Sequence, residues 1–391
     1  MKRLLISIYG FAFFNKFLLL TPVYAIFMQQ NGLSDFMLSS MFILSALGTI
    51  FGQFPVTLLT NKLGQRASMI VGQCLKAFAI LLWLAIPNYI GFSVGMILWG
   101  VQAGFRSVAF EGLIYDNVAA NGAKKDYTRI LGRKSTYESV GTALSACGSL
   151  LMFLGYAWVT WLSVAAIAMS VVCLLMMHPM YRSNKKSIKS SGLISLFREG
   201  VLICLRTPCL LLTMILTLLV VNIPFLDDFL SPIGLQLGIS TEYVGILSFF
   251  LLGCATMGQR FAYRFAHIPE WLLCALIGVV GVGYITFGYI YNTNSLWILG
   301  MSYMIFYGIY TLLYARFQNM IPTTHRSVVL SLYTTMTYIV YMLVCGVIGL
   351  GSIWGSWRHS VIILGVLMLA LCVWAFVYAR PHCKLTNDTI A

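Results

Sequence analysis

The sequence predicts an all-helical membrane protein with twelve transmembrane helices. Three observations support this fold class. Twelve apolar stretches follow one another along 391 residues, and each is long enough to cross a bilayer, which takes about 20 residues of helix. Basic residues gather in every second gap between the stretches. The chain is 60% hydrophobic and only 9% charged, with a mean hydropathy of +0.87, so a soluble domain of any size is excluded.

The predicted spans are approximately residues 4–28, 36–60, 67–87, 90–118, 134–155, 157–178, 208–231, 242–264, 268–291, 295–316, 327–350 and 358–380. The first stretch is too long for the core of a signal peptide, and no small-residue cleavage site follows it. We therefore expect it to remain as a membrane helix.

The distribution of charge predicts the orientation. All but four of the 25 Lys and Arg lie before the first span, after the last, or in the gaps after the even-numbered spans. The exceptions are Arg358, in an opposite gap, and three residues inside apolar stretches: Lys16, Lys76 and Arg106. Because basic flanks stay on the cytoplasmic side, both termini are expected in the cytoplasm. The same topology explains the net charge of +14, so no nucleic-acid partner is expected.

Several function classes lack any motif. The chain has no GxxxxGK[ST] phosphate loop, no HExxH and no Ser-His-Asp arrangement, so we expect neither an ATP-driven pump nor an enzyme. Its ten cysteines form no CxxC pair and are expected to be free thiols. No metal and no cofactor is predicted.

A polar segment divides six spans from six. It begins at Pro179 and is followed by apolar residues at helical spacing, from Leu193 to Val201, which predict a short interfacial helix. The predicted domains are an N-terminal bundle (1–178), a cytoplasmic linker (179–207), and a C-terminal bundle with a short tail (208–391). Similar motifs after corresponding spans of the two halves indicate parallel repeats, a recurrent design among transporters.

Two motifs give the chain a family resemblance. The segment Gln53–Arg66 between the second and third spans carries Lys62, Gly64 and Arg66 and resembles the signature loop of the major facilitator superfamily. Asn61 stands where that pattern has an aspartate. The segment Glu111–Asp116, with the basic stretch after it, is similar to the bacterial drug:proton antiporter branch of that superfamily. The resemblance covers nearly the whole chain.

The resemblance implies a fold of two six-helix bundles around a central cavity, working by alternating access. It also implies secondary active transport, with proton-coupled export of an amphipathic or drug-like solute as the leading function. Two alternatives stay open: proton-coupled uptake of a small organic anion or nutrient, and lipid flipping. The expected partners are a small organic solute, protons and the lipid bilayer. We expect a monomer in a bacterial inner membrane.

Charged residues inside a bilayer are expensive and tend to face a cavity or a partner. Glu111 is the predicted proton-coupling acid, and the competing interpretation is a static ion pair between helices. Lys16 and Arg106 each lie close to mid-membrane and would attract an anionic solute or compensate the charge of Glu111. Lys76 is interpreted as extending along its apolar stem toward the cytoplasmic interface. Glu138 is expected near the interface, paired with Arg133 or Lys134.

Residues near the cytoplasmic surface form the predicted inner gate, with Asp116 and Arg66 as its central pair. The full set is Asp116, Lys62, Gly64, Arg66, Arg129 and Arg133. The alternative is that the basic members only determine topology. Asp227 and Asp228 are a candidate outer gate or a solvated helix end. A run of small residues, 141–149, is expected to permit close helix packing. Tyrosines such as Tyr303 and Tyr307 would line a cavity or pack.

Overall fold

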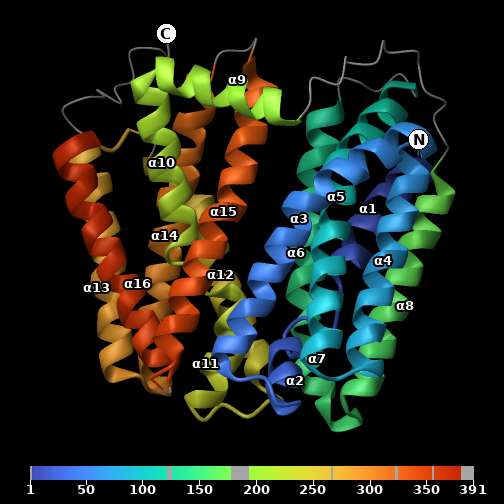
Figure 1. Cartoon of the computed structure of the whole chain (residues 1–391), viewed down its shortest axis with the longest axis horizontal. Helices are drawn as coiled ribbons and strands as arrows, with labels where there is room; N and C mark the ends of the chain where they lie inside the picture. Colours follow the sequence, from blue (N-terminus) through green and yellow to red (C-terminus); the bar gives the residue numbers. More distant parts are fainter. Residues whose placement is uncertain are drawn as a thin grey trace. The chain divides into compact units, whose positions relative to one another are not determined.

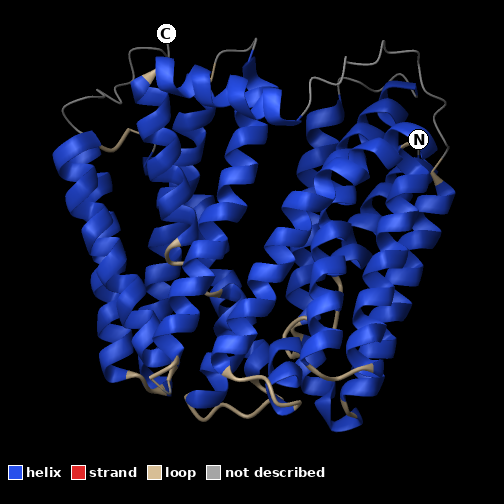
Figure 2. Cartoon of the chain, in the orientation of Figure 1, coloured by secondary structure: helices blue, strands red, loops and turns tan. Residues whose placement is uncertain are grey.

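The structure is a computed structural model that describes residues 2–120, 126–177, 193–265, 267–321, 325–354 and 356–379. Within these ranges every regular element is a helix, and the connections are short (Figures 1 and 2). The chain divides into two compact units. Unit 1 comprises Met1–Ser187, Asp228–Leu235 and Ile239–Phe249, and unit 2 comprises Ile188–Asp227, Gln236–Gly238 and Phe250–Ala391.

Most spans of the N-terminal half are single helices, whereas the first and fifth are divided. The helices are α1 (Lys2–Lys16), α2 (Tyr24–Gln30), α3 (Asp35–Leu63), α4 (Gln65–Ala85), α5 (Tyr89–Ala120), α6 (Tyr127–Ser145), α7 (Cys147–Leu150) and α8 (Tyr156–Met176). α5 packs against α3 and α4, and α1 packs against α6 and α8. The core near the start of α1 is apolar and includes Phe11, Phe110 and Leu174.

The C-terminal half has one additional helix, α9, before its six spans, and the first of these spans is divided like the first span of the chain. The helices are α9 (Leu193–Arg206), α10 (Pro208–Asn222), α11 (Leu230–Gln236), α12 (Val244–Ala262), α13 (Glu270–Ile290), α14 (Leu296–Met320), α15 (Arg326–Ser352) and α16 (Trp357–Trp374), followed by a π-helix (Ala375–Ala379). α13 packs against α14 and α16, and α10 packs against α14 and α15. α9 lies across the ends of α10 and α15 in unit 2, as expected for an interfacial helix (Figure 1).

Nine helical segments of the described residues are long and apolar enough to cross a membrane. They correspond to nine of the twelve predicted spans. The remaining three predicted spans correspond to α1 with α2, to α5, and to α6 with α7. The order of helices is therefore the one predicted from the apolar stretches.

The segment predicted as a loop between the second and third spans is almost entirely helical. Only Gly64, with φ of +84°, separates α3 from α4. The residues before it include Pro55 but are otherwise apolar or helix-compatible, so the helix continues for ten residues past Gln53. A left-handed φ of this kind is strained for any residue with a Cβ, which explains the glycine at this position.

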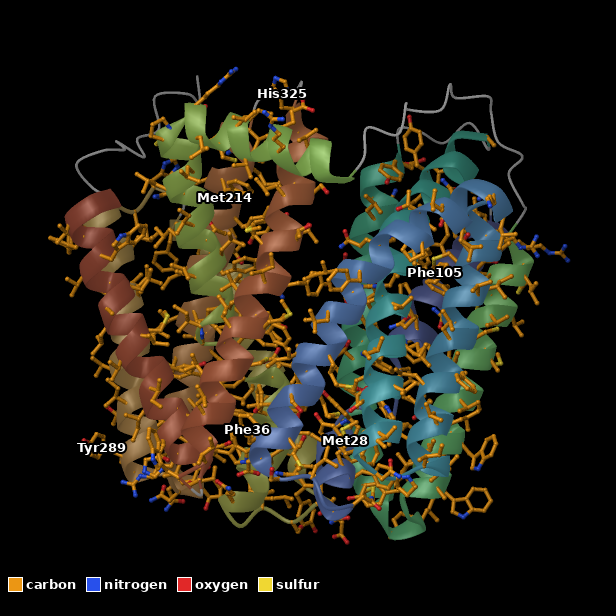
Figure 3. All side chains as sticks on the ribbon, in the orientation of Figure 1. Met28, Phe36, Phe105, Met214, Tyr289 and His325 are labelled. Carbon is orange, nitrogen blue, oxygen red and sulfur yellow. The ribbon has the colours of Figure 1, made fainter. Side chains whose placement is uncertain are left out.

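Two side-chain observations refine the sequence analysis. Arg358, the single basic residue in an opposite-side gap, donates from Nε to Gly288 O and from Nη2 to Tyr289 O, each at 2.9 Å. It thus caps the C-terminus of α13, at the end of unit 2 where Tyr289 is labelled in Figure 3. Among the described cysteines, eight form no disulfide bond. Cys209 is disulfide-bonded, so the prediction of free thiols is wrong at that position.

Candidate functional site

The first predicted span is interrupted within unit 1. α1 ends at Lys16 and α2 begins at Tyr24, with turns between them. Pro22 lies in this segment and favours an interruption, because proline lacks an N–H and its ring clashes with the preceding turn. The backbone N–H of Leu20 donates to Oγ of the buried Ser163 on α8 at 2.9 Å. The neighbouring helix therefore satisfies a donor that the interruption leaves free.

Two glycines of the fifth span allow the interrupted helix to approach closely. A Cβ on Gly141 would lie 2.5 Å from the carbonyl oxygen of Phe13, and one on Gly148 would overlap the carbonyl oxygen of Leu19. Both approaches are far closer than van der Waals contact. The small residues predicted to permit packing here thus lie directly against α1 and the turns that follow it.

A buried lysine holds the end of α1. Nζ of Lys76, on α4, donates to the backbone oxygen of Asn15 at 2.6 Å and to its Oδ1 at 2.9 Å. Gln73 Nε2 donates to the same Oδ1 at 3.1 Å, and Ser170 Oγ donates to Gln73 Oε1 at 3.1 Å. Nζ also lies 5.5 Å from the centroid of the Trp99 ring. A cation at a helix C-terminus is favourable because the last carbonyls lack partners inside the helix.

The prediction that Lys76 extends to the cytoplasmic interface is therefore wrong. Its side chain is 4% exposed and points to α1 inside the bundle. The physical reason is the interruption after Lys16, which presents carbonyl acceptors at this depth. Hydropathy alone gives no sign of those acceptors, because the apolar stretch continues through the interruption.

A second group of charged side chains surrounds Glu138 on α6. Arg106 Nη1, from α5, lies 3.2 Å from Glu138 Oε1, and Lys134 Nζ lies 3.5 Å from the same oxygen. Lys134 also lies 5.3 Å from the centroid of the Phe110 ring. The Glu138 side chain is 16% exposed and that of Arg106 is 38% exposed. The carboxylate is thus largely enclosed while the guanidinium remains accessible.

Lys16 belongs to this group by position. A Cβ on Gly141 would lie 3.3 Å from the Cβ of Lys16, and Gly141 follows Glu138 by three residues on α6. Lys16 also interacts electrostatically with Arg106, Glu138 and Lys134. Lys76 interacts electrostatically with Lys16 and Arg106 and so belongs to the same group. We call the side chains of Lys16, Lys76, Arg106, Lys134 and Glu138 the cationic cluster.

The cationic cluster has an excess of positive charge. In formal charge, four basic side chains accompany the one carboxylate that the structure describes in the cluster, that of Glu138. The side chain of Glu111 lies outside the described residues, but adding its formal negative charge still leaves two positive charges. In a medium of low dielectric constant such an excess attracts anions strongly.

The structure brings some predicted site residues together and leaves others apart. Lys16 and Arg106 both lie in the cationic cluster. Among the described side chains, the acid that pairs with Arg106 is Glu138. The sequence predicted that Glu138 lies near the interface and pairs with Arg133 or Lys134 of the same helix. Its i,i+4 spacing from Lys134 was a usable signal for that pair. Its contact with Arg106 depends on how α5 and α6 pack, which no local pattern encodes.

The predicted inner gate contains one well-defined contact. Arg66 Nη2 donates to the backbone oxygen of Leu175, in the last turn of α8, at 2.7 Å. The side chain of Asp116 lies outside the described residues. The two motifs that carry the family resemblance do meet, because a Cβ on Gly112 would lie 2.6 Å from Nε2 of Gln65. Three further basic residues of the predicted gate are exposed: Lys62, Arg129 and Arg133.

The seventh predicted span is interrupted as well, at the position that corresponds to the first. α10 ends at Asn222 and α11 begins at Leu230, with Pro224 between them. In unit 2, two tyrosines satisfy the backbone of this segment. Tyr284 donates to the backbone oxygen of Pro224, and the backbone N–H of Leu226 donates to the hydroxyl of Tyr303 at 3.2 Å.

The candidate outer-gate residues Asp227 and Asp228 have different partners. Asp227 accepts from the hydroxyl of Tyr307 at 3.0 Å, and both belong to unit 2. Asp228 accepts from the hydroxyl of Tyr24 at 3.1 Å, and both belong to unit 1. One of the points where the chain passes between the units is therefore the peptide bond that joins the two aspartates. Asp227 is exposed and Asp228 is half-buried.

The all-helical fold and the arrangement of its interrupted helices define a membrane transporter. The sequence profile of the Major Facilitator Superfamily matches residues 5–345. The chain belongs to this superfamily and is a secondary transporter, not an enzyme. No curated protein sequence matches the chain significantly.

Solved transporters share the fold at low sequence identity. The nucleoside transporter NupG aligns with a TM-score of 0.73 and 11% identity, covering 97% of this chain and 99% of that one. A bacterial homologue of the human lysosomal transporter Spinster aligns with a TM-score of 0.70 and 14% identity, covering 97% of each chain. The xylose transporter XylE from E. coli aligns with a TM-score of 0.67 and 12% identity, covering 96% and 95%. At these identities the likeness shows the fold.

Proposed function

We propose that this protein carries an organic anion across the membrane by alternating access, coupled to the movement of protons. The observation that carries the proposal is the cationic cluster, in which four basic side chains surround the one described carboxylate and two of them, Arg106 and Lys134, pair with it. A neutral or cationic solute would leave this charge uncompensated. An anionic group on the solute compensates it, and Arg106 is the accessible member that would bind such a group first.

The geometry around Glu138 supports a means of coupling. Glu138 and an incoming anion compete for the guanidinium of Arg106, because both offer acceptor oxygens to the same donors. When a proton neutralises Glu138, Arg106 becomes available to the solute. Glu111, the coupling acid predicted from sequence, lies on the same helix as Arg106 and is the alternative. Either carboxylate would couple proton binding to anion binding.

A transport assay in reconstituted vesicles tests the proposal. Vesicles with an imposed pH gradient receive a panel of radiolabelled carboxylates and phosphate esters alongside neutral and cationic solutes of similar size. We expect accumulation of one or more anions. Arg106→Gln should raise the KM for that anion about tenfold or more, since a charge-assisted contact contributes on the order of 1.5–3 kcal/mol. Arg106→Lys should retain part of the affinity.

The matched control is Arg260→Gln, an exposed arginine on α12 outside the cluster, which should leave KM unchanged. Comparison of Glu138→Gln with Glu111→Gln identifies the coupling acid. The variant that still exchanges solute across the membrane, but no longer accumulates it in response to the gradient, has lost that acid. Accumulation of cations alone, with Arg106→Gln unimpaired, would contradict the proposal.

Proton-coupled export of an amphipathic or drug-like solute is a second candidate, favoured by the exporter-like segment Glu111–Asp116. The two candidate functions are compatible if the exported compound carries an anionic group. Inverted and right-side-out vesicles give opposite signs of accumulation and so determine the direction.

We also propose roles for the gate residues. On the outer side, the Tyr24–Asp228 hydrogen bond joins α2 to the residues that precede α11 within unit 1, and it would have to break when α11 separates from α2. On the inner side, Asp116 and Arg66 form the proposed latch. Asp116→Asn should lower the yield of crosslinks between cysteines placed across the proposed cytoplasmic gate. An unchanged yield would reduce Asp116 to a surface charge.

A further inference from the structure

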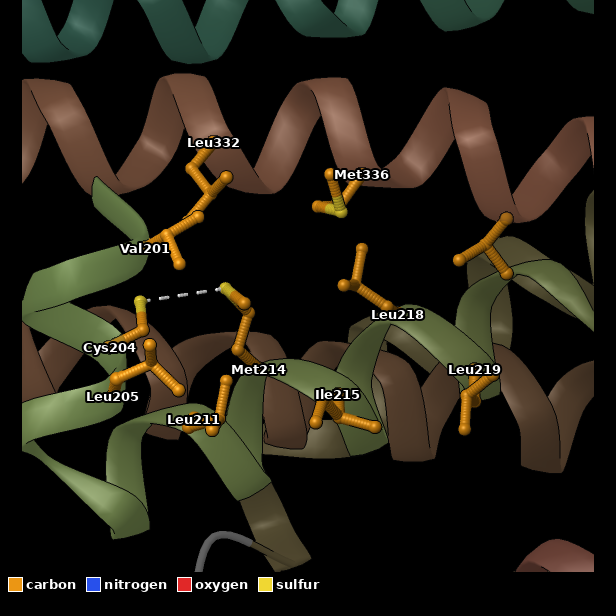
Figure 4. A pocket seen from close by; sticks show the side chains of 11 residues that line it. Val201, Cys204, Leu205, Leu211, Met214, Ile215, Leu218, Leu219, Leu332 and Met336 are labelled. Carbon is orange, nitrogen blue, oxygen red and sulfur yellow. Dashed lines mark hydrogen bonds between the residues drawn. The ribbon is translucent and has the colours of Figure 1, made fainter. Parts of the chain in front are cut away.

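An apolar cavity lies in unit 2, beneath α9 and apart from the cationic cluster. It has a volume of about 320 Å³, and α9, α10 and α15 supply the eleven side chains that line it (Figure 4). α9 contributes Val201 and Cys204, α10 contributes Met214 and Leu218, and α15 contributes Leu332 and Met336. Every lining residue is aliphatic or sulfur-containing, so the cavity offers no charged group and no strong hydrogen-bonding side chain to a ligand.

The thiol in the lining behaves as an apolar group. Cys204 is 1% exposed, and its Sγ lies 4.0 Å from the Sδ of Met214. Burial raises the pKa of the Cys204 thiol above its usual value, so it stays protonated at neutral pH. Met214 and Met336 have flexible thioether side chains, which adapt to the shape of a bound hydrocarbon chain. These properties suit a hydrocarbon ligand.

The exposed side of α9 and the start of α15 have the opposite character. Arg198 and Arg206 are exposed on α9, and Arg326 begins α15, whereas Glu199 is the acid described on α9. His325 lies beside α9 at this end of unit 2, 3.8 Å from Glu199 (Figure 3). Leu202 and Leu205, which are 43% and 59% exposed, continue the apolar surface between the two arginines of α9. An apolar cavity below a basic interfacial helix matches an acyl chain below an anionic headgroup.

We propose that the cavity beneath α9 binds one acyl chain of an anionic phospholipid whose headgroup contacts the arginines of α9. The hydrocarbon fills the space between α10 and α15, and the headgroup remains at the level of the interfacial helix. Bound in this way, the lipid fixes α9 against the bundle, since α9 contacts both α10 and α15. The proposal does not depend on the nature of the transported solute.

Photocrosslinking in liposomes tests the proposal on the full chain. The probe is phosphatidylglycerol with a diazirine midway along one acyl chain, and crosslinked peptides are identified by mass spectrometry. We expect crosslinks at cavity residues of α10 and α15, such as Met214 and Leu332. Met336→Trp, which fills the cavity, should reduce these crosslinks at least about fivefold. The matched control is Leu343→Trp on the same helix, a position 66% exposed and outside the cavity, which should leave them unchanged.

The headgroup is tested by competition. Unlabelled phosphatidylglycerol should displace the probe more effectively than phosphatidylcholine, and Arg198→Gln with Arg206→Gln should lower that preference by about fivefold for each arginine. Crosslinks spread evenly over exposed apolar positions, unaffected by Met336→Trp, would overturn the proposal. So would displacement of the probe by the transported solute or by a neighbouring segment of this chain. Equal competition by the two lipids would overturn the anionic headgroup.

Discussion

The interruptions of the first and seventh spans occupy corresponding positions in the two halves, yet different chemistry stabilises them. In unit 1 a lysine and a serine satisfy the backbone of the interrupted helix, and further basic side chains lie beside it. In unit 2 the hydroxyls of two tyrosines do so, and a third tyrosine donates to the carboxylate of Asp227. Both units must supply hydrogen-bond partners for the backbone, because an interrupted helix leaves polar groups unsatisfied inside the membrane.

This difference shows how two similar halves of one transporter can contribute differently to solute binding. The hydrogen bonds that the interruption requires can come from neutral or from charged side chains. Charged donors add an electrostatic bias toward one class of solute, whereas phenol groups add none. Solute charge selectivity should therefore depend on unit 1, and unit 2 should contribute mainly shape. The predictions below test this contrast, beginning with the largest expected effect.

Gly148→Ala should destabilise the protein most. Its Cβ would overlap the carbonyl oxygen of Leu19, so the fifth span must move away from the interruption. Overpacking of this kind costs about 3 kcal/mol. The measurement is the thermal unfolding midpoint in detergent. Gly132→Ala on α6 is the control, because a Cβ there meets nothing within 4 Å. Equal midpoints for the two variants would show that the close approach at Gly148 is unimportant.

Lys76→Met should lower the free energy of unfolding by about 2 kcal/mol, since it removes two hydrogen bonds from a cation to Asn15. The exposed Lys62→Met provides the matched control. If both variants have the same free energy of unfolding, Lys76 does not stabilise the end of α1. The proposed difference between the interruptions of unit 1 and unit 2 then loses its main support.

Ser163→Ala and Tyr303→Phe remove one comparable hydrogen bond from each interruption, to Leu20 N and to Leu226 N. Each should cost about 1 kcal/mol. Chemical unfolding curves of the two variants compare the interruptions directly. A loss confined to one variant would mean that only one of the two interruptions needs its side-chain partner.

Tyr307→Phe should have the smallest effect. It removes a hydrogen bond to the exposed carboxylate of Asp227, which contributes about 0.5 kcal/mol. The KM for the transported anion should therefore change by less than about threefold, against about tenfold for Arg106→Gln. A change in preference between anionic and neutral solutes in Tyr307→Phe would show that unit 2 also determines charge selectivity.

The sequence by itself determined the helical fold, the order of the helices and the superfamily. These follow from apolar stretches, from the alternation of basic residues and from the motifs around Gly64 and Glu111, all of which are local in the chain. The interruptions were not predictable in this way. Pro55 lies inside the continuous helix α3, whereas Pro22 and Pro224 lie in interruptions, although all three occur in apolar surroundings. Whether a proline interrupts a helix depends on whether neighbouring helices offer partners for the backbone.

Only the tertiary structure decided the composition of the cationic cluster. The pattern singled out Lys16 and Arg106 because charge inside an apolar stretch is conspicuous. It assigned Lys76 to the interface and did not join Glu138 to Arg106, because those contacts connect α4 with α1 and α5 with α6. Residues so far apart in sequence meet through helix packing. The sequence shows which residues are charged, whereas helix packing determines which residues they contact.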